Sequence, residues 1–304
     1  MFFGWELVGL SSYLLISFWS KKPSAAKAGN KAFILNRVGD FGFLVGLMVI
    51  LNTFNTFDFY TVLKSASDVP ENTVTIISLF LLLGAFGKSA QFPLFSWLPD
   101  AMEGPTPASA LIHAATMVTA GVFMLVRISP ILQYSKIAGM VIVLVGLLTA
   151  LLAAFSAINQ YDIKKVLAYS TISQLGFMFI AIGAGAYVAA IFHLVTHAFF
   201  KALLFLGAGA VIHSMHHEQD IRKMGKLRKK MPVTASMMGI GTLAISGIPP
   251  LAGFWSKDEI LASVFANGGM YYIFWVLGLS AALLTAFYMG RHWLLIFEKD
   301  NGFD

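Results

Sequence analysis

The chain has 304 residues, of which 58% are hydrophobic and only 12% are charged. Proteins that fold in water average about 45–50% apolar and about 25% charged residues. A soluble fold would therefore lack the polar side chains needed to cover its core. The sequence predicts an all-α integral membrane protein with a single membrane domain over residues 1–304.

Several classes of function are excluded by composition alone. The chain has no cysteine, which removes thiolate zinc sites, cysteine-bound iron–sulfur clusters, disulfides and cysteine nucleophiles. It also has no glycine-rich phosphate loop. The net charge of +6 is better explained by basic cytoplasmic loops than by nucleic-acid binding. We expect no metal, no cofactor and no nucleic acid on this chain.

Hydropathy predicts a bundle of transmembrane helices, because a crossing helix needs about 20 mostly apolar residues. We expect nine crossings, near residues 3–20, 33–54, 73–98, 105–128, 137–158, 163–183, 186–213, 233–266 and 270–296. Helix-breaking residues interrupt two of them: the third contains Gly84, Gly87 and Pro93, and the eighth contains Gly247, Pro249, Pro250 and Gly253. Interrupted helices need shielding from lipid by protein or by a wet cavity.

The basic residues outside the crossings support this map. If the loop after the first crossing is cytoplasmic, alternation places fourteen lysines and arginines in cytoplasmic loops and three on the opposite side. The fourteen are Lys21, Lys22, Lys27, Lys31, Lys164, Lys165, Arg222, Lys223, Lys226, Arg228, Lys229, Lys230, Arg291 and Lys299, and the three are Lys64, Arg127 and Lys136. Such an asymmetry is what the positive-inside rule predicts.

Ionisable side chains inside the apolar segments are the candidate functional residues. They are Glu6, Asp40, Lys88, His113, His193, His197, Lys201 and Lys257. Each charge at the bilayer centre costs at least about 2.5–3.5 kcal/mol on insertion scales, so such residues usually mark an ion pathway. The alternative is a set of structural ion pairs and interfacial lysines. For Asp40, a structural pair with Arg37 one turn away is an equally good interpretation.

Two lysines lie beside the predicted interruptions. Lys88 adjoins the break in the third crossing, and Lys257 adjoins the break in the eighth. Broken helices at matching places in two halves are typical of transporters built from inverted repeats. We therefore divide the chain into a first, incomplete half over 1–128 and a second half over 137–296. Movement of Glu6 relative to Lys88 would switch that lysine between holding and releasing a proton.

Three titratable residues share one predicted helix face. His193, His197 and Lys201 are spaced i, i+4 and i+8, which forms a line about 12 Å long at 1.5 Å per residue. An i, i+4 histidine pair can bind zinc, but no HExxH motif or flanking carboxylate is present. Haem ligation would require His113 to face one of these histidines, and it is disfavoured. Core histidines bonded to neighbouring helices remain the structural alternative.

Long stretches of the sequence resemble the antiporter-like proton-translocating subunits of respiratory complex I. The strongest is GKSAQFPLFSWLPDAMEGPTPASALIHAATMVTAGVFMLVR, and others are WELVGLSSYLLISFW, DIKKVLAYSTISQLGFMF, THAFFKALLFL and FWSKDEIL. The resemblance covers essentially the whole chain. It implies two inverted five-helix repeats, and proton translocation coupled to electron transfer from NADH to quinone in a separate arm. NADH, flavin, iron–sulfur clusters and quinone would belong to other subunits, and neighbouring membrane subunits would be its partners.

The same resemblance implies a role for each candidate residue. Glu6 corresponds to the carboxylate paired with the first-half lysine, Lys88, whereas Lys201 is the connecting lysine and Lys257 the terminal one. His113, His193 and His197 are implied relay residues, and Asp40, Asp100, Lys164 and Asp258 are implied secondary positions. The membrane would be the bacterial plasma membrane or the mitochondrial inner membrane. Family members are roughly twice this long and have three or four helices before the position of Glu6. We therefore expect the first repeat in this sequence to lack its opening helix.

Three other functions compete with this interpretation. A subunit of an Mrp-type Na⁺/H⁺ antiporter needs no electron donor, and a bicarbonate-accumulation membrane subunit belongs to the same superfamily. The MEGPTP stretch and Thr119 resemble complex I more than Mrp, where APTP and a lysine are expected. A haem-binding membrane cytochrome subunit is the alternative from a different class.

Overall fold

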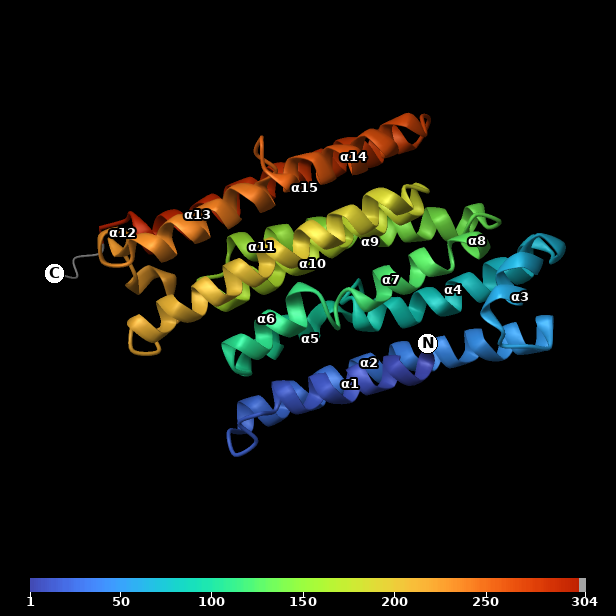
Figure 1. Cartoon of the computed structure of the whole chain (residues 1–304), viewed down its shortest axis with the longest axis horizontal. Coiled ribbons are helices and arrows are strands. Elements are labelled where there is room, and N and C mark those ends of the chain that lie inside the picture. Colours follow the sequence, from blue (N-terminus) through green and yellow to red (C-terminus); the bar gives the residue numbers. More distant parts are fainter. Residues whose placement is uncertain (301–304) are drawn as a thin grey trace.

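The computed structural model describes residues 1–300, which form a bundle of α-helices joined by short loops. Six helices are long and apolar enough to cross a membrane. They are α2 (Pro23–Phe54), α4 (Glu71–Lys88), α9 (Lys136–Ile158), α10 (Ile163–Gly183), α11 (Tyr187–Ser214) and α15 (Tyr271–Phe297). These helices run side by side along the long axis of the molecule (Figure 1). The prediction of an all-α integral membrane protein is confirmed.

Shorter helices build the other predicted crossings. These are α1 (Phe2–Ile16), α6 (Thr106–Ala114) followed by α7 (Ala120–Arg127), and α13 (Pro232–Ser246) followed by α14 (Ala252–Ala266). The connecting elements are α3 (Phe59–Lys64), η1 (Ser65–Asp68), η2 (Leu94–Ser96), α5 (Trp97–Asp100), η3 (Ala101–Glu103), α8 (Ser129–Leu132), η4 (Ile221–Lys223) and α12 (Leu227–Lys230). Each of the nine predicted segments therefore corresponds to one long helix or to a run of shorter ones.

The third segment is interrupted beside Lys88 and at Pro93, as predicted, but not at the two glycines. α4 continues through Gly84 and Gly87 and ends at Lys88, and η2 begins only after Pro93. A Cβ atom on Gly87 would lie 3.3 Å from the Cα atom of Gly39 on α2. The glycines of α4 are thus contact points between helices rather than breaks, because small residues let membrane helices approach closely.

The interruption of the eighth segment is where the sequence places it. α13 ends at Ser246, and the next residue, Gly247, adopts a left-handed φ of 77°, a conformation that glycine adopts without strain. A Cβ atom on Gly253, in the first turn of α14, would overlap the carbonyl oxygen of Ala244. A further interruption, residues 115–119 between α6 and α7, contains neither glycine nor proline and was not predicted.

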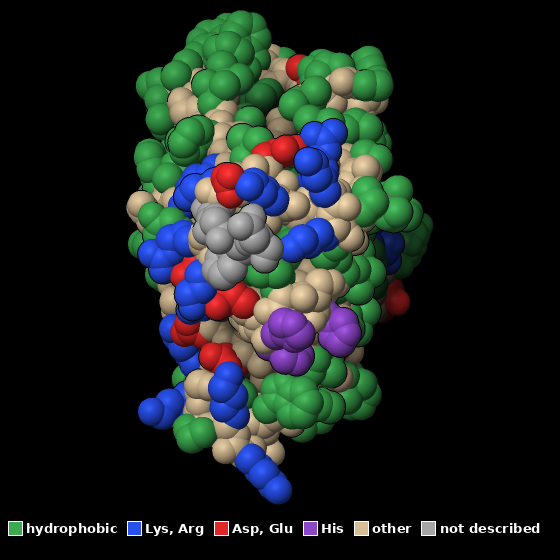
Figure 2. Space-filling model, turned by 90° about the vertical axis from the view of Figure 1, so that its left-hand side faces the viewer, with side chains coloured by type: hydrophobic (Ala, Val, Ile, Leu, Met, Phe, Trp, Pro, Cys, Tyr) green, Lys and Arg blue, Asp and Glu red, His purple; other side chains and the backbone are tan. Residues whose placement is uncertain are grey.

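The charged loops gather at one end of the bundle, as the positive-inside pattern predicts. Lys22 pairs with Glu103 at 2.7 Å, and Lys31 pairs with Asp100 at 2.6 Å. Arg291 donates to the carbonyl of Gln160 in the α9–α10 loop. Figure 2 shows lysines, arginines and histidines clustered on this end of the molecule. We call it the basic end.

Helix α10 is the centre of the bundle. In the most apolar stretch of α10, 89% of the residues are buried inside the protein, whereas the corresponding share for α15 is 33%. It packs closely on α9, because glycines face each other across the contact at two levels, Gly146 with Gly176 and Gly139 with Gly183. Polar side chains on α10 are therefore shielded from lipid by protein.

Candidate functional site

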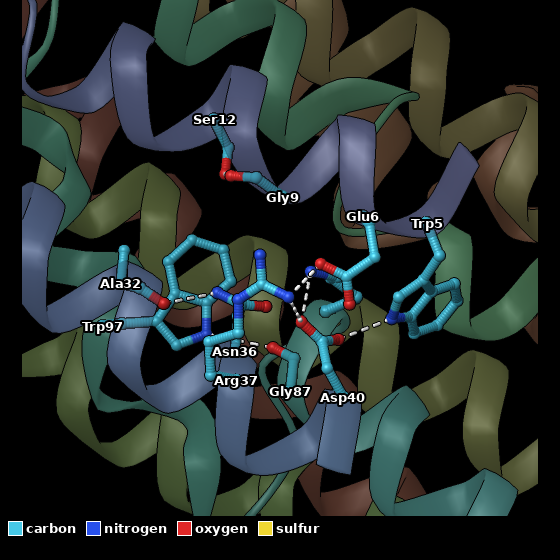
Figure 3. Close-up of polar contacts among 11 residues, drawn as sticks. Trp5, Glu6, Gly9, Ser12, Ala32, Asn36, Arg37, Asp40, Gly87 and Trp97 are labelled. Carbon is cyan, nitrogen blue, oxygen red and sulfur yellow. Dashed lines mark hydrogen bonds and ion pairs between the residues drawn. The ribbon is translucent and has the colours of Figure 1, made fainter. Parts of the chain in front are cut away.

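Lys88 forms a buried ion pair with Asp40. The lysine is the last residue of α4 and is 1% exposed, and its Nζ atom lies 3.2 Å from Oδ2 of Asp40 on α2. Trp5 on α1 donates its indole N–H to the other oxygen of Asp40 at 2.7 Å (Figure 3). The Cβ of an alanine at Gly9 would lie 2.6 Å from the lysine Nζ. Three helices thus create a pocket for one amine.

The predicted direct pair between Glu6 and Lys88 is not formed. Glu6 is instead bonded to Arg37 on α2, and this arginine also lies 3.8 Å from Oδ2 of Asp40 (Figure 3). Asp40 therefore contacts both cations, which confirms its pairing with Arg37 and adds a partner that the sequence did not indicate. One carboxylate oxygen of Glu6, Oε1, is buried without a hydrogen-bond partner in residues 1–300. The four side chains form a chain of charge: Glu6, Arg37, Asp40, Lys88.

Lys201 lies at the centre of a second cluster and is bonded only to neutral oxygens. Its Nζ donates to the carbonyl of Leu167 at 3.1 Å and to the hydroxyl of Ser170, both on α10. The lysine is completely buried. No carboxylate in the described part of the chain lies within ion-pair distance of it. Burying a charge without a counter-ion is costly, so the neutral oxygens of α10 are what hold this amine.

Two histidines accompany this cluster. His197 on α11 bonds through Nδ1 to the carbonyl of Ala114 at 3.1 Å, where α6 ends at its interruption. His113 is also completely buried and stacks on Phe205 with ring centroids 5.6 Å apart. Neither nitrogen of His113, nor Nε2 of His197, has a partner within residues 1–300. Buried polar atoms of this kind are normally satisfied by internal water.

The third cluster surrounds Lys257 at the α13–α14 interruption. Its Nζ donates to the carbonyl of Ile245 at 2.6 Å and lies 5.2 Å from the ring centroid of Phe177. The carbonyl belongs to the last turn of α13, where carbonyl groups lack helical partners. The broken helix therefore supplies the oxygen that holds the amine. The neighbouring residue, Asp258, is exposed and does not pair with Lys257.

His193 connects the central helix to this third cluster. Its Nδ1 lies 2.8 Å from the hydroxyl of Ser256 on α14, and its Nε2 lies 3.1 Å from Oε1 of Gln174 on α10. Neither Ser256 nor Gln174 was predicted from the sequence, because an isolated serine or glutamine carries no distinctive pattern. Their complete burial is the structural signal that identifies them.

Two of the secondary positions lie at the basic end rather than among the three clusters. Asp100 pairs with Lys31, and the buried Lys164 donates to the carbonyl of Gly104 at 2.9 Å. Both residues line a cavity of about 630 Å³ that Lys22 and Glu103 also border. At the membrane surface, burial alone would raise the pKa of Glu103, but the hydrogen bond and charge of Lys22 outweigh it and lower that pKa.

The arrangement places titratable groups in the interior of the bundle. Within residues 1–300, no group of three or more histidine, aspartate or glutamate side chains is placed to hold a metal ion. The amines of the three clusters, Lys88, Lys201 and Lys257, lie on α4, α11 and α14, with buried histidines on α6 and α11. Histidine exchanges protons near neutral pH, and the unpartnered ring nitrogens are sites where water can bond.

Comparison with known proteins agrees with this chemistry. A family model described as NADH:quinone oxidoreductase/Mrp antiporter, transmembrane region, matches residues 1–285. The chain is 53% identical to NADH-quinone oxidoreductase subunit L of Rhodobacter capsulatus over 318 residues, which cover 98% of this chain and 44% of that relative. It is 53% identical to NADH-ubiquinone oxidoreductase chain 5 of Metridium senile over 301 residues, covering 99% of this chain and 50% of that protein.

A solved structure of an Mrp complex from Dietzia sp. matches with a TM-score of 0.91 at 33% identity, covering 99% of this chain and 33% of the other. The chain spans about half the length of the curated relatives it matches. The match over residues 1–285 shows that the chain belongs to the transmembrane family shared by NADH:quinone oxidoreductases and Mrp antiporters.

Proposed function

We propose that this chain belongs to a proton-translocating membrane subunit of an NADH:quinone oxidoreductase. The observation that carries the proposal is a set of three buried lysines with titratable or hydroxyl groups between them: Lys88 and Lys257, which lie at helix interruptions, and Lys201, which is bonded to the central helix α10. The names of the relatives at 53% identity support this enzyme. The two inverted repeats, over 1–128 and 137–296, are part of the proposal.

Protons would pass between the clusters by way of hydrated histidines. Asp40 holds the charge on Lys88, and His113 and His197 lie next to the irregular end of α6 on the way to Lys201. His193 then joins α10 to α14, beside Lys257. Glu6, bonded to Arg37 at the outer side of the first cluster, would compete with Asp40 for the cations when the pairs rearrange.

The redox chemistry of the enzyme would take place elsewhere. NADH, flavin, iron–sulfur clusters and quinone would be bound by other subunits, and this chain would respond to them through neighbouring membrane subunits. Its relatives include proteins of Rhodobacter capsulatus and Metridium senile. The proposed location is accordingly a bacterial plasma membrane or a mitochondrial inner membrane.

The test is proton pumping by the intact complex in liposomes, driven by NADH and quinone. Lys88→Ala should abolish pumping and strongly depress quinone reduction, because the first cluster loses its transferable proton. Lys64→Ala is the control, since Lys64 is exposed in the α3 helix at the opposite end from the basic loops. Undiminished pumping by Lys88→Ala would contradict the assigned role.

A second function, Na⁺/H⁺ exchange, is favoured by the structural match to the Mrp complex. The two functions differ in their driving force. If this chain belongs to an antiporter, a sodium gradient imposed across liposomes should move protons without NADH. If it belongs to the oxidoreductase, the same gradient should leave the internal pH unchanged.

A further inference from the structure

A buried histidine outside the three clusters carries an inference that rests on the proposed function and deepens it. His292 on α15 is completely buried, and neither ring nitrogen has a hydrogen bond of ordinary geometry within residues 1–300. An apolar residue would fill such a site at no polar cost, whereas an unpartnered buried imidazole is unfavourable unless water satisfies it. The environment of this ring therefore needs an explanation.

His292 belongs to a polar stripe on a helix that otherwise faces the protein with apolar groups. Thr285, Tyr288 and His292 are spaced i, i+3 and i+7, so they share one face of α15, and all three are completely buried. The stripe is opposite α10. The hydroxyl of Tyr288 lies against Ser173 and Gln174, and the ring of His292 faces the backbone of Ile163.

Helix α10 gives the depth of His292 relative to Lys201. Ile163, Leu167 and Ser170 are spaced i, i+4 and i+7 and lie on one face of α10. His292 is beside the first of them, and the amine of Lys201 is bonded to the other two. At 1.5 Å per residue, the imidazole lies about 6–10 Å nearer the basic end than the amine.

The surface of the basic end is close on the other side of His292. The preceding residue, Arg291, donates to the carbonyl of Gln160 at 3.1 Å and lies over the ring of Tyr161 with its Cζ 4.8 Å from the centroid. Both partners belong to the α9–α10 loop. The charged groups that act on the imidazole are Lys201 from α11 and Arg291 from α15. His292 thus lies between the outermost loop and the central lysine.

The unpartnered polar atoms of this region are not confined to the histidine. Oγ of Ser173 and Nε2 of Gln174 are also buried, and apart from the Tyr288 hydroxyl that these two residues face, neither atom has a hydrogen-bond partner in the described residues. Gln174 is bonded through its other end to His193. Water bonded to these atoms would connect the α15 stripe with the second and third clusters, because buried water typically makes about three hydrogen bonds to such groups.

We infer that His292 is a proton-relay residue that supplies Lys201 from the basic end of the bundle. A proton from water at the basic end bonds to one ring nitrogen, and the other ring nitrogen releases its proton to water next to the neutral amine of Lys201. That water passes the proton to the amine, which becomes an ammonium, and rotation of the ring restores its starting tautomer before the next transfer, so the imidazole itself ends unchanged. No oxidant or reductant takes part.

The test is NADH-driven proton pumping by the intact complex in liposomes, measured from pH 6.0 to pH 8.5. His292→Gln keeps a polar side chain that does not titrate, so pumping should fall about tenfold at pH 8.5 and less than about twofold at pH 6.0, where bulk protons are plentiful. His216→Gln, an exposed histidine at the same end, should match the parent at both values. His292→Met provides an apolar replacement if the glutamine variant does not assemble.

Three results would overturn the inference. Pumping at the parent rate by both His292 variants at pH 8.5 would show that the imidazole carries no protons. An equal loss at every pH would show a structural role only. Lys201→Ala, measured in the same assay, distinguishes failure of the relay from failure of the proposed function. If Lys201→Ala pumps normally, the proposed function fails and the relay fails with it. If Lys201→Ala loses pumping while His292→Gln pumps normally, only the relay is overturned.

Discussion

Replacement of Asp40 by asparagine is the most direct test of the first cluster. The change removes the negative charge that lies 3.2 Å from the amine of Lys88 but leaves an oxygen that can still accept from Trp5. At an effective dielectric constant of about 20, two unit charges at that separation attract by about 5 kcal/mol. Loss of one partner of a buried pair typically costs about 3–5 kcal/mol. We therefore expect Asp40→Asn to lower the free energy of unfolding by about 3–5 kcal/mol.

A double-mutant cycle separates this pair from general damage to the fold. Lys88→Met removes the buried cation together with its need for a counter-ion, so Asp40→Asn with Lys88→Met should be more stable than Asp40→Asn alone. The coupling between the two changes should reach up to about 3 kcal/mol. Equilibrium unfolding of the chain in mixed micelles measures all four proteins. Asp68→Asn, at an exposed carboxylate, is the control and should change stability by less than about 0.5 kcal/mol.

The refuting result is additivity. If the two single changes sum to the double change, the carboxylate and the amine do not depend on each other, and the first cluster cannot act as a charge-coupled unit. The functional readout is separate, because the double variant lacks the transferable proton. It should be stable and assembled, yet it should not pump.

Two further predictions follow from packing and from a surface carboxylate. Gly253→Ala places a Cβ where the carbonyl oxygen of Ala244 lies, so the free energy of unfolding, measured by thermal unfolding, should fall by about 1–3 kcal/mol. Gly4→Ala is the control, because Gly4 has open space around it, and it should show no such loss. An equal loss in both variants would contradict the contact between Gly253 and Ala244. Burial alone would raise the pKa of Glu103, but the bond from Lys22 lowers it. The Lys22–Glu103 ion pair therefore stabilises the α1–α2 loop at pH values above the ordinary pKa of glutamate. This stabilisation is lost as the pH falls through the lowered pKa of Glu103. Relative to the intrinsic exchange rate at each pH, the protection of amide hydrogens in that loop should fall on acidification below about pH 4.5, and unchanged protection would refute the link.

The sequence predicts much of the fold because its signals are local. Hydropathy marks each crossing, and the basic loops assign their sides, so every predicted segment has a counterpart in the structure. Gly247 fixes the end of α13, because its left-handed backbone suits glycine. By contrast, Gly84 and Gly87 were misjudged as breaks. In a sequence, a glycine that ends a helix and one that permits a close helix contact look the same.

The candidate site was predicted less completely, since its pairings depend on how helices are placed around one another. The sequence selects Lys88 and Asp40 as ionisable groups in apolar surroundings, but which carboxylate meets the amine depends on the packing of α1 and α2 against α4. Glu6 is drawn to Arg37, leaving Asp40 to Lys88. His292 was missed for a related reason. A single histidine near a helix end looks interfacial until the structure shows it to be completely buried.

The three lysines differ in what holds their charge, and this difference bears on the direction of transfer. Lys88 has a carboxylate as its partner, whereas Lys201 and Lys257 have only carbonyl or hydroxyl oxygens. A full negative charge stabilises a buried cation more than a dipole does, so the protonated state should be most favourable at Lys88. A proton can move on from it only when Asp40 turns to another cation, and Arg37, 3.8 Å away, is the cation in position to take it. Exchange of Asp40 between the arginine and the lysine is therefore the step that we expect to control release into the second cluster.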